Sequence, residues 1–404
     1  MQIISGGVLA PKGFKANGIH CGIRKNKTKK DLALIVSDNI CTSASVYTTN
    51  LVKGAPILVT KENLKDGKAQ AVIVNSGNAN TCNANGVEIA SKMCDLVEKH
   101  TGIKSSDVIV ASTGVIGQPL DITPIENAME KLVGGLDIGT SVDANEAIMT
   151  TDTIRKEIAV SVTIGGKEVK IGGIAKGSGM IHPNMATMLV FLTSDCNISS
   201  EMLYKAIKED IEDSFNMVTI DGDTSTNDML SILANGQAGN KIIDGDGEDY
   251  ENFKKALGEV TRYLCRLIAK DGEGATKLLE CKTIGAKDKA TAKTVSKSVV
   301  SSSLFKAAMF GADANWGRVL CAIGYSGVQV EINKIDVTFK SVAGEILVCS
   351  NGASVDFDED KAKDILTKDE IEIIINLKSG DAVSCAYGCD LTYDYVKING
   401  DYRT

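Results

Sequence analysis

Histidine is scarce in this sequence. The 404-residue chain has three, His20, His100 and His182, and they lie far apart. Without an HExxH motif they are not expected to assemble a metal site. No GxSxG sequence accompanies them, which argues against a hydrolase of the Ser-His-Asp type. We therefore expect no metal and no imidazole-based triad.

The cysteines do not form a recognisable framework. There are eleven, an odd number, and none stands in a CxxC motif. The closest pair, Cys385 and Cys389, has no histidine nearby. The N-terminal sequence lacks the basic segment and long apolar segment of a signal peptide. Scattered thiols in such a chain predict a cytoplasmic protein without disulfides.

Long apolar runs and an excess of positive charge are also absent. No stretch approaches eighteen consecutive apolar residues, so we expect no membrane-spanning segment. Lys and Arg number 44 against 52 Asp and Glu, a net charge of −8. This balance argues against nucleic acid as a partner and suits a soluble globular protein.

Short apolar, β-branched runs separated by glycine or asparagine predict many strands. They fall at 32–37, 43–48, 55–60, 70–75, 107–112, 157–164, 168–175, 187–194 and 216–221, and later at 328–340, 344–350 and 370–377. Helical spacing of apolar residues occurs at 84–100, 123–133, 200–214, 250–269 and 358–368.

The order of these elements indicates the fold class. Strands and helices mix without strict βαβ alternation, which predicts an α/β (α+β) protein of layered mixed β-sheets flanked by helices. A smaller, strand-rich C-terminal lobe is expected. The serine-rich run 296–305 has the weakest pattern and is interpreted as a hinge.

One segment carries potential chemistry. Residues 171–195 pass from an apolar strand through a Lys-Gly-Ser-Gly loop and a His-Pro-Asn turn into a second apolar strand that starts at Thr187. By periodicity alone, Thr187 is simply the first residue of a core strand. The alternative is self-cleavage, in which the Thr187 hydroxyl attacks the Ala186–Thr187 bond and the resulting ester is hydrolysed.

Cleavage would give Thr187 its own base. The new α-amine has an ordinary pKa of about 7.7–8.0, so part of it is neutral near pH 7. It can accept the proton of the hydroxyl on the same residue, as in N-terminal threonine nucleophiles. This mechanism needs no histidine. His182, five residues upstream, is an alternative base, although a structural role in the turn fits it better.

Several strings together identify a family. AKGSGMIHPNMATMLVF resembles the signature of the ArgJ-type ornithine acetyltransferases (glutamate N-acetyltransferases), which are self-processing enzymes of arginine biosynthesis. Further matching strings cover most of the chain: VNSGNANTCNANG (74–86), STGVIGQPL (112–120), AIMTTDT (147–153), DGDTSTND (221–228), AKDGEGATK (269–277), FGADANWGRVL (310–320) and VKINGDYRT (396–404).

The resemblance implies an activity and a site. Acetyl would pass from N2-acetylornithine to glutamate through an acetyl-Thr187 intermediate, without a cofactor; some members also use acetyl-CoA. Thr113 and Gly114 would form the oxyanion hole. Substrate would contact Thr150 (or its neighbour Thr151), Lys176, Thr187, Glu273, Asn399 and Thr404, where Lys176 and Glu273 suit opposite charges of the substrate.

The resemblance also implies an organisation. A DmpA/ArgJ-like fold would comprise a main lobe at 1–280, a second lobe at 281–395 and a tail at 396–404 that returns to the site. Cleavage would give an α chain, 1–186, and a β chain, 187–404, which would associate as an α2β2 assembly. Two alternatives stay open: a related self-processing aminopeptidase or amidase that uses water as acceptor, and an uncleaved, inactive scaffold.

Overall fold

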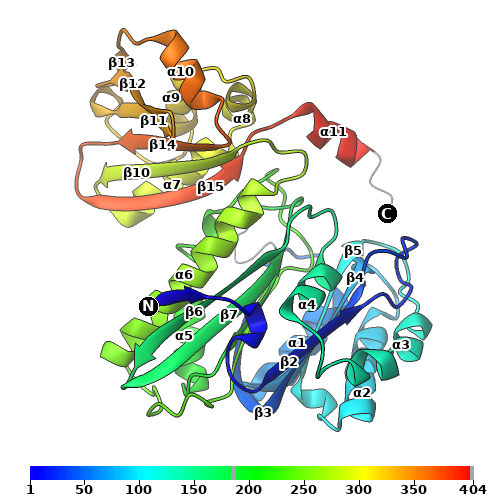
Figure 1. Ribbon diagram of the computed structural model, residues 1–404. Coiled ribbons are helices and arrows are strands. Elements are labelled where there is room, and N and C mark those ends of the chain that lie inside the picture. Colours follow the sequence, from blue (N-terminus) through cyan, green and yellow to red (C-terminus); the bar gives the residue numbers. More distant parts are fainter. Residues whose placement is uncertain (183–187, 401–404) are drawn as a thin grey trace.

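The computed structural model describes residues 1–182 and 188–400 and contains two β-sheets (Figure 1). The first has nine strands in the order β1-β6-β7-β8-β9-β3-β4-β5, with β2 paired to β3. These strands are β1 (Gln2–Ile4), β2 (Phe14–Ile19), β3 (Leu32–Tyr47), β4 (Lys68–Asn78), β5 (Val108–Val115), β6 (Lys156–Ile164), β7 (Lys167–Lys176), β8 (Leu189–Ser194) and β9 (Met229–Ala234).

Helices cover both faces of this sheet because its central strands are apolar on both sides. In β8, Val190 and Leu192 pack into the core under α5 (Ser200–Asp210) and α6 (Glu248–Lys270). Leu189 and Phe191 point to the opposite face, as the period-two geometry of a strand requires.

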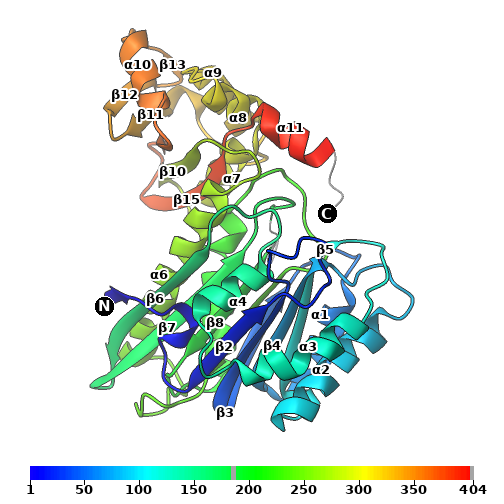
Figure 2. The ribbon, with the colours of Figure 1, turned by 45° about the vertical axis from the view of Figure 1, so that its right-hand side comes forward.

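The helix α4 (Ser141–Ile148) packs on this opposite face, where its apolar side chains join the core of Leu189 and Phe191 (Figures 1 and 2). The helices α2 (Gly86–Thr101) and α3 (Thr123–Gly134) pack on the other side of β4 and β5, because their core takes the alternate strand residues, such as Ile73 between Val72 and Val74. The helix α1 (Ala55–Asn63) contributes to both cores.

The second sheet forms a smaller lobe, with strands in the order β13-β12-β11-β14-β10-β15 (Figure 1). Its strands are β10 (Leu278–Ala286), β11 (Asp336–Ser341), β12 (Gly344–Ser350), β13 (Ala353–Ser354), β14 (Glu370–Asn376) and β15 (Ala382–Cys389). A separate apolar core joins them to α7 (Lys289–Ser301), α8 (Ser303–Phe310), α9 (Trp316–Gly324) and α10 (Glu359–Leu366).

The predicted fold class is confirmed. Parallel pairs (β4 with β5, β8 with β9, β10 with β14) stand among antiparallel ones, so both sheets are mixed. The last helix, α11 (Tyr393–Gly400), leaves the second lobe and lies over the end of the first lobe that faces it (Figures 1 and 2).

The prediction of a strand at 55–60 is wrong, because this run lies within α1. Pro56 stands in the first turn of the helix, where its missing N–H has no intrahelical partner to lose and its fixed φ favours the helix. Ile57 and Val59 are buried in different cores, so the run is apolar on more than one side and its periodicity resembles that of a buried strand.

Two further expectations are corrected. Residues 216–221 form no strand: a 3₁₀ turn at Phe215–Met217 is followed by a loop, and the next strand along the chain is β9. The run 296–305 is no hinge, because α7 continues to Ser301 and α8 starts at Ser303. The Ser302 hydroxyl caps α8 by accepting from the Phe305 N–H, so one of its serines acts as a cap.

Among the described residues, no helix is both long enough and apolar enough to cross a bilayer.

Candidate active site

A cavity of about 360 Å³ lies where several chain segments converge. Its lining includes every predicted site residue that falls within the described ranges: Thr113, Gly114, Thr150, Lys176, Glu273 and Asn399. These come from β5, the segment after α4, the end of β7, the loop after α6, and α11. Ala186, Thr187 and Thr404 lie outside the described residues.

The end of β5 approaches β4 unusually closely. Gly114 pairs with Gly77 and Thr113 with Ser76 in a parallel register that becomes irregular one residue later. Gly114 has φ of +133°, and a Cβ there would clash with the carbonyl carbon of Gly77. Only glycine fits both constraints, so the strand end brings backbone rather than side chain to the cavity.

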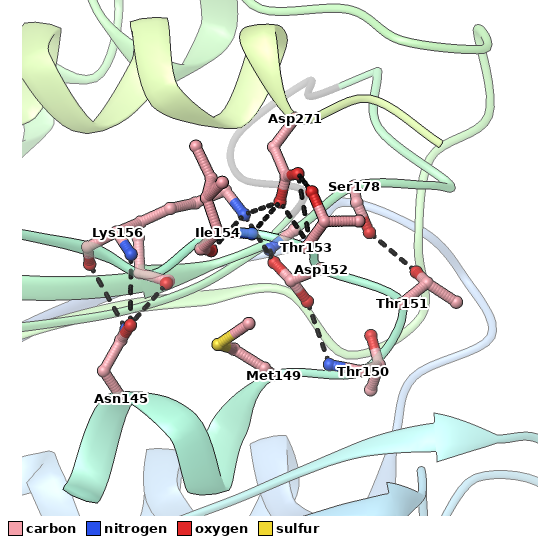
Figure 3. Close-up of polar contacts among 12 residues, drawn as sticks. Asn145, Met149, Thr150, Thr151, Asp152, Thr153, Ile154, Lys156, Ser178 and Asp271 are labelled. Carbon is pink, nitrogen blue, oxygen red and sulfur yellow. Dashed lines mark hydrogen bonds and ion pairs between the residues drawn. The ribbon is translucent and has the colours of Figure 1, made fainter. Parts of the chain in front are cut away.

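Two threonines follow α4 and both line the cavity. The Thr151 hydroxyl is 2.6 Å from the Ser178 hydroxyl. The Thr150 hydroxyl makes no hydrogen bond within residues 1–182 and 188–400, whereas its N–H donates to Asp152 Oδ2 at 2.9 Å. Thr150 is thus held by its backbone, which leaves its hydroxyl available to a ligand (Figure 3).

Lys176 is a nearly buried cation at the end of β7. Its side chain is 8% exposed. Burial lowers the pKa of the Lys176 ammonium, while the negative charges of Asp152, Asp228 and Glu273 oppose that shift. An ammonium in this position is available to pair with an anionic ligand.

Glu273 supplies the opposite charge and connects the cavity to the tail helix. Its Oε2 accepts from Asn399 Nδ2 at 2.7 Å, and its N–H donates to the Ser178 carbonyl at 2.8 Å. A Cβ at Gly179 would clash with the Glu273 carboxyl, so this glycine permits the close approach. The cavity therefore presents both a cation and an anion.

A buried ionic network beneath the cavity was missed by sequence reasoning. The Lys156 ammonium lies 2.7 Å from Asp152 Oδ1 and 2.5 Å from Asp271 Oδ2, and all three side chains are essentially inaccessible. Burial alone would raise the pKa of the Asp152 carboxyl. The charges of Lys156 and Lys176 and the N–H of Gly177, 2.7 Å from Oδ1, hold it well below its usual range.

This network joins the segments that carry the site (Figure 3). Asp152 accepts from the N–H groups of Thr150 and Gly177, the latter adjacent to Lys176. Asp271 accepts from the Thr153 N–H at 3.0 Å and from its hydroxyl, and lies two residues before Glu273. The one feature of the sequence that could have indicated this network is the four-residue spacing of Asp152 and Lys156 within TTDTIRK.

Asn227, within the string DGDTSTND, was also given no role from the sequence. It lines the cavity, and its amide donates to the carbonyls of Ala79 at 2.6 Å and Ser112 at 3.0 Å. It thereby ties the start of β9 to the ends of β4 and β5. Its neighbour Asp228 is buried, and burial raises the pKa of that carboxyl well above its usual range.

His182 does not line this cavity. Its Nδ1 is 3.0 Å from the Thr219 hydroxyl, and its carbonyl accepts from Thr224 at 2.9 Å. Burial, aided by Lys297, lowers the pKa of the imidazole to about 4. The ring is therefore neutral near pH 7, and these contacts suit a structural role in the turn.

A cavity that presents both a cation and an anion suits an enzyme that acts on small polar molecules. The ArgJ family model matches residues 15–404. The arginine biosynthesis bifunctional protein ArgJ of Caldanaerobacter subterraneus subsp. tengcongensis is 47% identical over the full length of both chains. ArgJ 1 of Clostridium acetobutylicum is 49% identical over 97% of this chain and 96% of its own.

A solved structure agrees with these relatives. The crystal structure of the arginine biosynthesis bifunctional protein ArgJ from Bacillus halodurans is 43% identical and covers 52% of this chain and 97% of its own, with a TM-score of 0.50. The chain belongs to the ArgJ family. It is an acetyltransferase of arginine biosynthesis. The family match over residues 15–404 favours this function over that of an aminopeptidase or amidase.

Replacing Lys156 with Met should destabilise the protein by about 3–5 kcal/mol, because two buried carboxylates lose their cation. Urea unfolding followed by circular dichroism measures the free energy. Lys254→Met is the matched control: its ion pair with Glu209 is solvent-accessible, and its loss should cost less than about 1 kcal/mol. Equal losses in the two variants would contradict the role given to the network.

Replacing Gly114 with Ala should reduce kcat/KM of acetyl transfer at least about tenfold, because β5 must move away from Gly77. Gly102→Ala is the control, since Gly102 also has positive φ, +78°, but no atom lies near a Cβ there. It should lose about 1 kcal/mol of stability and keep its activity. Unchanged kinetics in Gly114→Ala would show that the close approach is dispensable.

Proposed function

We propose that the enzyme transfers acetyl from N2-acetylornithine to L-glutamate through an acetyl ester on Thr187. The observation that carries this proposal is the cavity, which gathers a buried ammonium, a carboxylate, threonine hydroxyls and a glycine strand end from distant segments. A site with both charges suits amino acids, whose ammonium and carboxylate groups need opposite partners.

Each half-reaction exchanges one bond for another. The Thr187 oxygen attacks the acetyl carbonyl, a C–O bond forms, the C–N bond to ornithine breaks, and the hydroxyl proton passes through the α-amine to the leaving amine. The glutamate amine then attacks the ester, a C–N bond forms, the C–O bond breaks, and a proton returns to Thr187.

Negative charge develops on the carbonyl oxygen in both halves. We assign its stabilisation to backbone N–H groups at Thr113 and Gly114, where the absence of a Cβ on Gly114 permits close approach. Each such donor contributes roughly 2.7–4 kcal/mol to the transition state.

The remaining lining residues are assigned to substrate recognition. Lys176 pairs with the α-carboxylate, and Thr150 donates or accepts through its hydroxyl. Glu273 pairs with the substrate amines, held in place by Asn399. Thr404 completes the set at the end of the tail, by the family resemblance.

Thr187 becomes the nucleophile when the chain cleaves itself between Ala186 and Thr187. The α chain, 1–186, and the β chain, 187–404, would remain interleaved, because β8 and β9 lie between β7 and β3 in the first sheet. β7 and β8 pair antiparallel over six residues each, from Ile171 opposite Ser194 to Lys176 opposite Leu189. The Bacillus halodurans chain, about half as long as this one, has a length consistent with one such product.

The lobe boundaries, the subunit assembly and the cellular location are proposed from the family resemblance. We propose lobes at 1–280 and 281–395 with a tail at 396–404; the start of the second sheet at Leu278 supports this division. We also propose an α2β2 assembly in the cytoplasm, where the eleven unpaired cysteines would stay reduced. The α-amine supplies the base, so the mechanism uses no cofactor.

Replacing Thr187 with Ala should abolish both cleavage and transfer, because attack on the chain and attack on the substrate use the same hydroxyl. Denaturing electrophoresis should show one band of 42.7 kDa for the variant and two smaller bands for the wild type. N-terminal sequencing of the wild-type β chain should read TMLVF. A different start would place the nucleophile elsewhere.

Deleting residues 399–404 should raise the KM for acetylornithine about tenfold, because Glu273 loses its hydrogen bond to Asn399 and the cavity loses part of its wall. Self-cleavage should persist, since the deletion leaves residues 186 and 187 in place. Lys397→Ala, an exposed change on the same helix, should behave as wild type. Wild-type kinetics in the truncated enzyme would exclude the tail from the site.

A further inference from the structure

One segment, residues 220–229, binds the chain on both sides of the proposed cleavage point. On the upstream side, the Ile220 N–H donates to the Ile181 carbonyl at 2.7 Å. On the downstream side, the Met229 N–H donates to the Met188 carbonyl at 2.9 Å. Both bonds join backbone groups, so they fix the path of the chain rather than the direction of one side chain. The bond to be cleaved lies in the short stretch between these two anchors.

Asp221 adds charge-assisted hydrogen bonds to the upstream anchor. Its Oδ2 accepts from the Met180 N–H at 2.6 Å, and its Oδ1 accepts from the Ile181 N–H at 2.8 Å. Hydrogen bonds to an ionised acceptor are stronger than those between neutral groups. Each donor has an oxygen of its own, which a carboxylate provides and a carboxamide, with a single acceptor oxygen, does not.

Met180 is held in a conformation that a residue with a Cβ normally avoids. Its φ is +56°, in the left-handed region. The side chain lines the active-site cavity and is 42% exposed, so packing of this side chain does not impose the conformation. The two hydrogen bonds to Asp221 compensate for the backbone strain. The chain that leaves the cavity therefore turns at a position set by Asp221.

Thr224 extends the same anchor one residue closer to the cleavage point. Its hydroxyl donates to the His182 carbonyl at 2.9 Å, and it forms an antiparallel bridge with Ile181. Asp221 and Thr224 do not line the active-site cavity, which takes residues 225–227 from this segment. They are therefore placed to act on the path of the chain and not on the substrate.

We propose that Asp221 is a positioning residue for self-cleavage, which fixes the chain before Thr187 so that its hydroxyl meets the Ala186 carbonyl. This inference rests on the proposed cleavage and adds the group that prepares it. The Thr187 oxygen attacks the Ala186 carbonyl carbon, a C–O bond forms, the C–N bond breaks and the hydroxyl proton passes to the new amine. Water then cleaves the ester, which leaves a carboxylic acid on Ala186 and a hydroxyl on Thr187. Restricting the chain beforehand reduces the entropy lost when these atoms meet.

Acetyl transfer depends less on Asp221 than cleavage does. After cleavage, Thr187 begins the β chain, and the residues that follow it are held by β8, which pairs with β7 and β9. The upstream anchor then belongs to the α chain and no longer reaches Thr187 through a covalent bond. We therefore expect that loss of the Asp221 carboxylate slows cleavage and leaves transfer by the processed enzyme nearly unchanged.

The rate of processing of the full chain tests the proposal. In cell-free translation with labelled methionine followed by a chase, the 42.7 kDa band of Asp221→Asn should convert to two smaller bands at least about tenfold more slowly than that of the wild type. The kcat with acetylornithine and glutamate, per mole of processed enzyme, should stay within about twofold of the wild-type value. A residue that only stabilised the fold would lower both rates together.

Two further variants complete the experiment. Asp223→Asn is the matched control, because it removes one negative charge from an exposed position of the same segment, while the N–H groups of Met180 and Ile181 donate to Asp221. It should be cleaved at the wild-type rate. Thr224→Val removes one neutral hydrogen bond of the anchor and should slow cleavage about threefold, which still yields processed enzyme for the measurement of kcat.

The outcomes separate this inference from the proposed function. Cleavage of Asp221→Asn at the wild-type rate, or equally slow cleavage of Asp223→Asn, would overturn the inference alone. A fall in kcat that matches the fall in cleavage rate would also overturn it. If Asp221→Asn is not cleaved at all, a wild-type cleavage rate or a lowered kcat in Thr224→Val would have the same consequence. A wild-type chain that is never cleaved would refute the proposed function itself.

Discussion

The ammonium of Lys156, shared between Asp152 and Asp271, is the interaction on which the site depends. Its two carboxylates belong to segments that also carry Thr150 and Glu273, and Asp152 further holds the backbone beside Lys176. A buried cation between two acids has few alternative arrangements, because any separation leaves an uncompensated charge away from water. The network therefore sets the spacing of groups that arrive from distant parts of the chain.

The strand order of the first sheet explains how the chain could be cleaved without its two products separating. Strands β8 and β9, which belong to the proposed β chain, lie between β7 and β3 of the proposed α chain. A cut before β8 would thus expose a new terminus without separating the sheet, since backbone hydrogen bonds and the core under α6 hold both products. Cleavage and catalysis can then use the same scaffold.

Local sequence patterns predicted part of this structure. The parts that depend on contacts between distant positions in the chain could not be predicted from such patterns. The alternation around Val190 and the spacing in α6 indicated a strand and a helix, because burial on defined faces leaves a period in the sequence. α1 was misread because it is apolar on more than one side. The family resemblance selected lining residues, but the contact between Lys156 and Asp271 joins positions 115 apart, and no local pattern encodes it.

Mass spectrometry of the β chain, after brief exposure of the enzyme to N2-acetylornithine without glutamate, shows directly whether Thr187 carries the acetyl group. We expect one added acetyl group, located on Thr187, that disappears when glutamate is supplied and reappears as acetylglutamate. An unmodified chain with rapid release of free acetate would indicate a hydrolase, and an acetyl group on any other residue would contradict the assignment of the nucleophile.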